Sequence, residues 1–315
     1  MAGRRLVFSN PEIIRILKEN FITYAGDQWY LNRQEDADGA FFWKVMDQGH
    51  LKSAPRNSTR QGVYACTSDG RHLGSRGFHP YPERTLELLR SALQQWNAGP
   101  KHAVLSESPA RPDARYDRKP PEGGLILNVF TRIPIPQEPG KWTPNNATGR
   151  DHMWITRDEM KLLIPQSWRK GASVAIPKAV AERLVRYHLV DNVRGEPNHW
   201  DQAEVTESSL KLEVENPGTH TLRLSGTARM KTADGRRGYD TRVQGHLTCN
   251  PAMDRFSRFD VISWGEAWGS GTYTEGAPPG RFPLVIALSL AGNKSADMVA
   301  PQASRWLPGY LTPGR

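Results

Sequence analysis

Cysteine is scarce in this chain of 315 residues, in which only Cys66 and Cys249 occur, far apart along the sequence. Two thiols cannot form a structural zinc site by themselves, and a chain of this length can bury a core without disulfides. No run approaches the roughly 20 apolar residues that a membrane-spanning helix requires. These absences exclude a disulfide scaffold and a membrane span, and both cysteines are expected to be small buried hydrophobes.

Several familiar motifs are missing as well. The 28 glycines never take the spacing of a P-loop, a dinucleotide fingerprint or a nucleophile elbow after a predicted strand. Residues 1–8 carry basic side chains but no apolar stretch of signal-peptide length. We therefore expect a cytoplasmic protein without membrane association, and the sequence names no cofactor and no metal site.

The charge is strongly positive, with 42 basic and 33 acidic residues giving a net charge of +9. Arginine supplies 30 of the basic residues, but they are spread over both halves and form no basic tail or block. Such a distribution is typical of a solvated surface of mixed charge. A nucleic-acid partner is therefore not favoured, and the expected partner is an unidentified protein or small ligand.

The first third of the sequence alternates helix and strand signals. Asn10 followed by Pro11 marks a helix start, because asparagine caps free amides and proline has no N–H to lose at the first helical position. Residues 21–25 (FITYA) predict a buried strand, and residues 36–48 predict a second helix.

A hairpin and a final helix follow. Residues 62–67 predict a strand, Asp69 and Gly70 a tight turn, and His72 the start of the partner strand. A helix is predicted from Pro82 to Trp96, since apolar residues recur there at helical spacing.

This order of elements resembles a thioredoxin-like domain over residues 1–97. The segment Ser9-Asn10-Pro11-Glu12 and the strand after it are similar to the family's helix and following strand, and the hairpin and the helix from Pro82 are similar to its C-terminal elements. Thioredoxin-like oxidoreductases carry a Cys-x-x-Cys pair at a helix N-terminus, and this chain has none. The resemblance therefore implies a truncated, redox-silent domain. The whole chain resembles an uncharacterised type of bacterial protein in which such a part precedes a β-rich part, which implies no activity.

A proline-rich segment of low apolar content predicts a linker over residues 98–122. Beyond it, residues 123–315 predict a mainly antiparallel β domain with two packed helices. Thr156 and Glu159 form a capping-box pattern for the first helix, and the second begins at Pro177 and runs to about Leu189. From Glu204 onward apolar residues alternate between turn signals, which indicates a meander or a partly closed barrel. The predicted fold class is α+β.

Candidate site residues concentrate in this β-rich part. A stretch at the end of the second helix combines imidazole, carboxylate, guanidinium and indole groups, a mixture suited to an acid–base pair, an anion clamp or a ligand pocket. These groups could instead neutralise the helix end and pair with nearby charges. The candidates in this stretch are His188, Asp191, Arg194, Glu196, His199 and Trp200.

Two further candidates lie on predicted strands. Glu266 stands between two Trp-Gly steps and could be a carboxylate in an aromatic pocket, and His246 lies on the neighbouring strand. Two hypotheses follow for the function. The first is a noncatalytic thioredoxin-like protein with a ligand- or protein-binding β-rich domain, and the second is a hydrolase or metal-dependent enzyme with its site in that domain.

Overall fold

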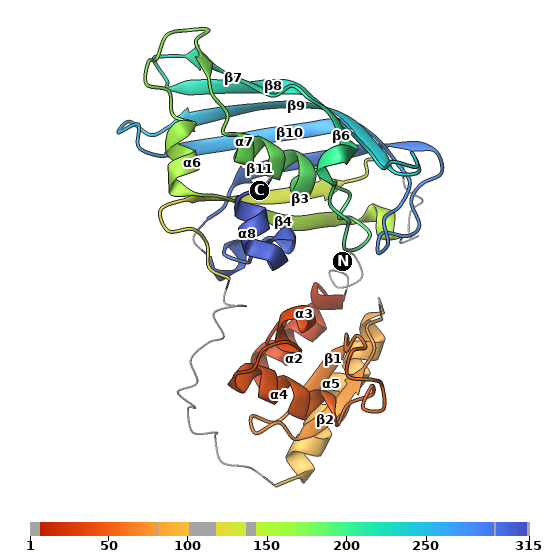
Figure 1. Cartoon of the computed structure of the whole chain (residues 1–315). Coiled ribbons are helices and arrows are strands. Elements are labelled where there is room, and N and C mark those ends of the chain that lie inside the picture. Colours follow the sequence, from red (N-terminus) through yellow and green to blue (C-terminus); the bar gives the residue numbers. More distant parts are fainter. Residues whose placement is uncertain (1–6, 80, 101–117, 137–142, 293, 314–315) are drawn as a thin grey trace. The chain divides into compact units, whose positions relative to one another are not determined.

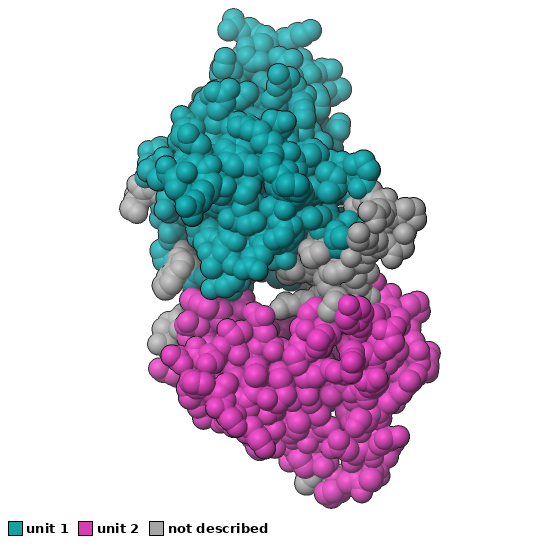
Figure 2. Space-filling model, turned by 90° about the vertical axis from the view of Figure 1, so that its right-hand side faces the viewer, with its two compact units in different colours: residues 1–2, 118–315 teal, residues 3–117 magenta. Residues whose placement is uncertain are grey.

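A computed structural model describes residues 7–79, 81–100, 118–136, 143–292 and 294–313. The chain divides into two compact units, residues 3–117 and residues 118–315, which Figure 2 shows in different colours. We call them the N-terminal unit and the C-terminal unit and describe each by itself. Most of the predicted linker, residues 101–117, lies outside the described residues. Within the described residues, no helix is long and apolar enough to cross a membrane.

Local capping signals set the helices of the N-terminal unit. The side chain of Asn10 accepts hydrogen bonds from the backbone N–H groups of Glu12 and Ile13, so the predicted helix start is confirmed. Asp36 caps the second predicted helix in the same way. The helices of this unit are α2 (Pro11–Asn20), α3 (Gln28–Leu31), α4 (Ala37–Met46) and α5 (Pro82–Ala98).

The predicted hairpin forms, but the predicted strand before it does not. Strands β1 (Val63–Cys66) and β2 (His72–Arg76) pair antiparallel around Gly70, whose φ of 84° a tight turn requires. Residues 21–25 have no regular structure, and Ile22 and Tyr24 within them are exposed to solvent. A lone strand would leave its backbone groups unpaired, and no neighbouring strand of this unit accepts them. The strand prediction is therefore wrong, and the thioredoxin-like architecture is not shown.

One antiparallel sheet of nine strands forms the C-terminal unit (Figure 1). Its order is β4-β3-β11-β10-β9-β8-β7-β5, and β6 pairs with β8. The α+β class with a large antiparallel sheet is thus confirmed. The strands are β3 (Leu125–Arg132), β4 (Thr148–Ile155), β5 (Ser173–Val174), β6 (Val205–Ser208), β7 (Lys211–Asn216), β8 (Thr221–Lys231), β9 (Gly238–Cys249), β10 (Phe256–Trp268) and β11 (Arg281–Leu290).

The sheet has a buried inner face and an exposed outer face, because successive side chains of a strand point to opposite sides. On β9 the residues Val243, Gly245 and Leu247 point inward, as the alternation predicts, while Arg242 and His246 point outward. Short helices cover the inner face, and the outer face is the far side of the sheet in Figure 1. The helices are α6 (Arg157–Leu162), α7 (Lys178–Arg183), which continues as a π-helical turn (Leu184–His188), and α8 (Leu307–Leu311) beside β4.

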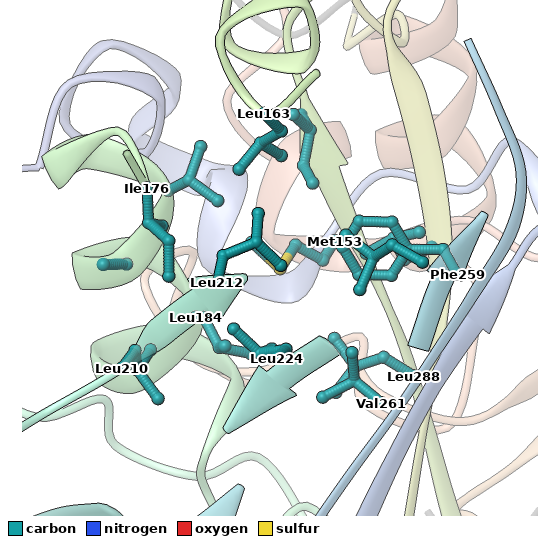
Figure 3. Close-up of a pocket in the computed structure, with 15 residues that line it drawn as sticks. Met153, Leu163, Ile176, Leu184, Leu210, Leu212, Leu224, Phe259, Val261 and Leu288 are labelled. Carbon is teal, nitrogen blue, oxygen red and sulfur yellow. The ribbon is translucent and has the colours of Figure 1, made fainter. Parts of the chain in front are cut away.

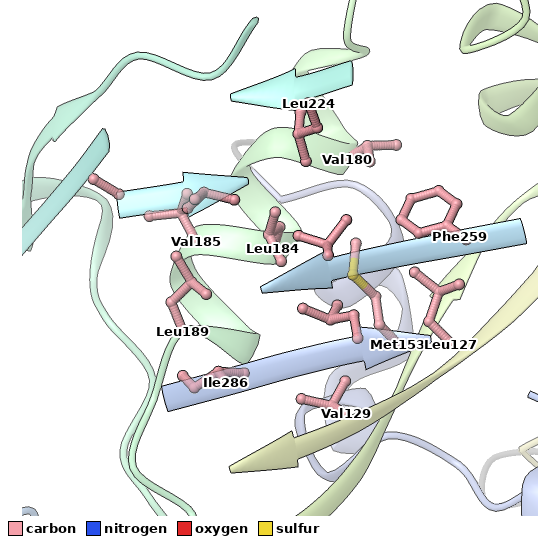
Figure 4. Packing of buried hydrophobic residues seen from close by; sticks show 14 of the residues in the cluster. Leu127, Val129, Met153, Val180, Leu184, Val185, Leu189, Leu224, Phe259 and Ile286 are labelled. Atoms are coloured by element: carbon pink, nitrogen blue, oxygen red, sulfur yellow. The ribbon is translucent and has the colours of Figure 1, made fainter. Parts of the chain in front are cut away.

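The core of the C-terminal unit lies between the inner face and the helix α7 with its π-helical turn. Figure 4 shows Val180, Leu184 and Leu189 pointing toward the strands, where Phe259 and Ile286 meet them. The predicted capping box is also confirmed, since Thr156 accepts from the backbone of Glu159 and the Glu159 carboxylate accepts from the backbone of Thr156. This box fixes α6 at the end of β4.

A small cavity lies inside this core (Figure 3). Its volume is about 30 Å³, and its walls are entirely apolar, with Met153, Leu212, Phe259 and Leu288 among them. Ligand pockets in proteins commonly measure about 300–1,000 Å³. The space is therefore too small for an organic ligand, and its apolar walls give a water molecule no hydrogen-bond partner.

Candidate functional site

A buried polar cluster lies where α7 meets the edge strand β4. The Arg183 side chain is fully buried, and its Nη1 and Nη2 each donate to one oxygen of Glu159 at 2.8 Å. Its Nη1 also donates to the backbone oxygen of Trp154 at 3.1 Å, and its Nε donates to the backbone oxygen of Tyr310 at 2.8 Å. One guanidinium thus joins α6, β4 and α8.

His188 and Tyr310 complete this cluster. The Tyr310 hydroxyl accepts from the backbone N–H of Trp154 at 3.1 Å and lies 2.8 Å from Nε2 of His188. The other ring nitrogen of His188 lies 3.4 Å from a carboxylate oxygen of Asp151. Burial raises the pKa of Tyr310, so this hydroxyl keeps its proton. The Tyr310 hydroxyl and the Arg183 guanidinium therefore hydrogen-bond the backbone N–H and C=O groups of Trp154 at the sheet edge. A strand of another chain cannot pair with these groups while they are bonded.

The loop after His188 is tied down by Arg194. This buried guanidinium pairs with Asp191 and donates to the Ser270 hydroxyl at 3.1 Å and to the backbone oxygen of Thr274. It therefore joins the helix end to the loop between β10 and β11. Gly195 makes this approach possible, because a Cβ there would lie 1.9 Å from the backbone oxygen of Tyr273.

The remaining candidates of this loop also make contacts within the protein. The Trp200 indole donates to the backbone oxygen of Leu189 at 2.8 Å, and the Arg237 guanidinium lies 4.0 Å from the centre of its ring. Glu196 pairs with Arg305. His199 stays exposed and packs edge-on against the ring of Tyr187, with the centroids 5.0 Å apart.

The two candidate stretches of the sequence meet at a shallow hollow. Asp191, Arg194 and Trp200 line it from one side, and Ala267 and Trp268 line it from the other. Its volume is about 20 Å³, room for one or two waters. The hollow brings three of the eight predicted site residues together, but its size does not admit a substrate.

Glu266 and His246 lie apart from that loop, on the outer face. Glu266 is 3.4 Å from Arg281, and His246 is 2.8 Å from Glu215. Among the described residues, no group of three or more His, Cys, Asp or Glu side chains is placed to hold a metal ion. The site residues predicted from the sequence therefore form two separate sets, one from His188 through the loop to Trp200 and one on the outer face of the sheet.

A third set of side chains was not predicted, and it extends over the outer face from the edge strand β4 to β9. Register places Arg132, Val285, Trp264 and Arg242 in one row across β3, β11, β10 and β9. The next row holds Arg150, Phe130, Ala287 and Ile262 across β4, β3, β11 and β10. We call the following six residues the arginine band: Phe130, Arg132, Arg150, Arg242, Ile262 and Trp264.

The arginine band differs from its surroundings in its charge pairing. Arginines nearby on the outer face pair with carboxylates, as Arg258 does with Asp260 and Arg281 with Asp240. Over the described ranges, no carboxylate pairs with an arginine of the band, although Arg150 lies 5.3 Å from the ring centre of Phe130. The band therefore combines unneutralised positive charge with apolar surface.

The comparisons with known proteins add no assignment to this geometry. No protein-family model, no curated protein and no solved structure matches the chain.

The two thiols are expected to react slowly, which gives a first testable prediction. Burial and the nearby Asp69 carboxylate raise the pKa of Cys66, and burial raises the pKa of Cys249 to about 11. A thiol with such a pKa is almost entirely protonated at neutral pH, whereas the thiolate is the reactive form. We expect slow labelling by Ellman's reagent at pH 7, rapid labelling after denaturation, and no reduction of insulin. Insulin reduction that disappears in Cys66→Ser would contradict this.

Proposed function

We propose that this chain is a noncatalytic binding protein whose C-terminal unit contacts an anionic partner through the arginine band. The observation that carries the proposal is a set of arginines without carboxylate partners among the described residues, around the exposed Ile262 and the half-buried Phe130 and Trp264, on an open sheet face. Surfaces that combine both kinds of group commonly mark interaction sites. The core cavity and the hollow beside Trp200 have room only for water molecules, so neither offers a site for a larger partner.

The pairing of charges on the outer face supports an anionic partner. Where arginine meets a carboxylate, as in the pair of Arg223 with Glu213, the local field is largely cancelled. Arg132, Arg150 and Arg242 are exposed, and none of them pairs with a carboxylate of the described residues. Guanidinium groups bind carboxylates, sulfates and phosphates through paired donors. An anion is therefore the partner that this face attracts.

For the N-terminal unit we propose a redox-silent, thioredoxin-like origin. The support is the order of its elements, in which α2 and α4 precede the hairpin and α5 follows it. Its one cysteine, Cys66, belongs to β1 rather than to a helix N-terminus. The missing strand at residues 21–25 makes any such relation a partial one.

Heparin chromatography tests the proposed function, because heparin is a polyanion without bases. The variant R132Q/R150Q/R242Q is expected to elute from a heparin column at clearly lower salt than the wild type, since it lacks the unpaired guanidinium groups. The matched control is R15Q/R84Q/R255Q, which removes the same charge at three exposed, paired arginines. Equal elution of the two triple variants would show net charge alone to be responsible and would contradict the proposal.

A further inference from the structure

The rows of the arginine band alternate cations with flat apolar side chains. In the first row the Trp264 indole stands between Arg132 and Arg242, with Val285 beside it. Arg132 and Arg242 are three strand spacings apart, roughly 14 Å. Trp264 makes no ring contact with any other described side chain. A half-buried aromatic side chain with one guanidinium on each side therefore lies on the outer face of the sheet.

Resting on the proposed function, we infer that the arginine band binds single-stranded nucleic acid. Proteins that bind such strands without sequence preference stack bases on aromatic side chains and hold the backbone phosphates with cations. Trp264 on β10 and Phe130 on β3, with β11 between them, supply the aromatic rings of the band, and the three arginines supply the cations around them. Several RNA-binding modules use the exposed face of a sheet in this way.

The combination of aromatic rings and arginines favours a single-stranded nucleic acid over other polyanions. An acidic peptide or heparin would neutralise the arginines but would place no flat ring on Trp264. A duplex would also present phosphates, but its bases are already stacked on one another and are not available to an indole. A single strand is the anion that uses both kinds of group in the band.

This inference reverses an expectation drawn from the sequence. The arginines of the band are 18 or more residues apart along the chain and never form a basic block. Strand pairing brings them together, because β3, β4 and β9 contribute one each. A binding face assembled from separate strands leaves no signal in local charge density.

Fluorescence anisotropy with labelled dT12 and U12 at low salt tests the inference. The wild type is expected to bind, with affinity falling as salt rises by a slope of about −2 for three phosphate contacts. Trp264→Ala is expected to weaken binding about tenfold, whereas Trp264→Phe should keep most of the affinity because a ring remains for stacking. R132Q/R150Q/R242Q should flatten the salt slope, and R15Q/R84Q/R255Q should not.

The outcomes separate this inference from the proposed function. Wild-type protein that binds heparin through the band but no oligonucleotide would overturn the inference and leave the proposed function standing. Tighter binding to a 12-base-pair duplex than to dT12 would also overturn it, as would equal loss in Trp264→Ala and Trp264→Phe. Thermal melting of each variant establishes that it is folded before its affinity is compared.

Discussion

Replacing Arg183 with alanine is expected to destabilise the C-terminal unit by about 3–5 kcal/mol, because one partner of a buried ion pair is removed while the other remains. Glu159 would keep a largely buried carboxylate without its guanidinium, and the backbone oxygens of Trp154 and Tyr310 would lose a donor. Urea unfolding followed by far-UV circular dichroism measures the loss.

Two control variants show whether the geometry of Arg183 matters. Arg183→Lys keeps the charge, but a lysine ammonium has only three donors for the five hydrogen bonds that the Arg183 guanidinium makes, so an intermediate loss is expected. Arg258→Ala removes an exposed guanidinium that pairs with Asp260 and should change stability by less than about 1 kcal/mol. Equal stabilities of Arg183→Ala and the wild type would show that the guanidinium does not hold this cluster.

The effect of Arg183→Ala should depend on pH through Glu159. Burial by itself raises the pKa of Glu159, but hydrogen bonds from Arg183 and Thr156 outweigh it and hold the pKa below its usual value. A carboxylate with a lowered pKa in the folded state stabilises the fold above its unfolded pKa, about 4.3. That contribution is lost as the pH falls through the folded pKa. The difference between wild type and Arg183→Ala should therefore shrink below about pH 4.

The sequence contains enough local information to predict most elements of the fold. The caps at Asn10 and Thr156 and the turn at Gly70 depend on residues close together in the chain, so they are readable without a structure. The alternation along β8 to β11 is readable for the same reason, since one face of each strand is buried.

The elements that sequence reasoning missed depend on neighbours far along the chain. Strand β4 has an apolar run only at Met153–Ile155, and its first half, with Gly149, Arg150 and Asp151, carries no strand signal. It forms because β3 pairs with it along its whole length. Residues 21–25 show the reverse case, in which a run of suitable side chains finds no partner strand and stays irregular.

For the candidate site too, the sequence shows which residues are present but not which distant residues they contact. The stretch from His188 to Trp200 could be identified as rich in polar chemistry, but whether its groups face a ligand or each other depends on partners such as Ser270, Thr274 and Tyr310. The arginine band could not be predicted from the sequence for a related reason. The alternation on β10 places Ile262 on the outer face, but only the register of four strands brings Arg132 and Arg242 near it.

Tyr310 provides the second large effect, because it closes the edge of the sheet at β4. Its ring is buried against Trp154 and Ala303, and its hydroxyl contacts the backbone of Trp154 and the ring of His188. Tyr310→Phe should lose about 1–3 kcal/mol, since the N–H of Trp154 is left buried without an acceptor. Tyr310→Ala should lose more, about 3–5 kcal/mol, because a cavity is added to the lost hydrogen bonds.

The two Tyr310 variants should also differ in self-association. In Tyr310→Ala the helix α8 loses its largest buried side chain, so the backbone of β4 becomes accessible to a strand of another molecule. Sedimentation velocity over a range of concentrations is expected to show dimers or larger species for Tyr310→Ala, while Tyr310→Phe keeps the ring that covers the edge and sediments like the wild type. Tyr310→Ala that loses stability but shows the wild-type distribution of species would mean that the side chain stabilises the core without protecting the edge. The opposite result, association with little loss of stability, would mean that α8 chiefly protects the edge of the sheet and contributes little to the packing of the core.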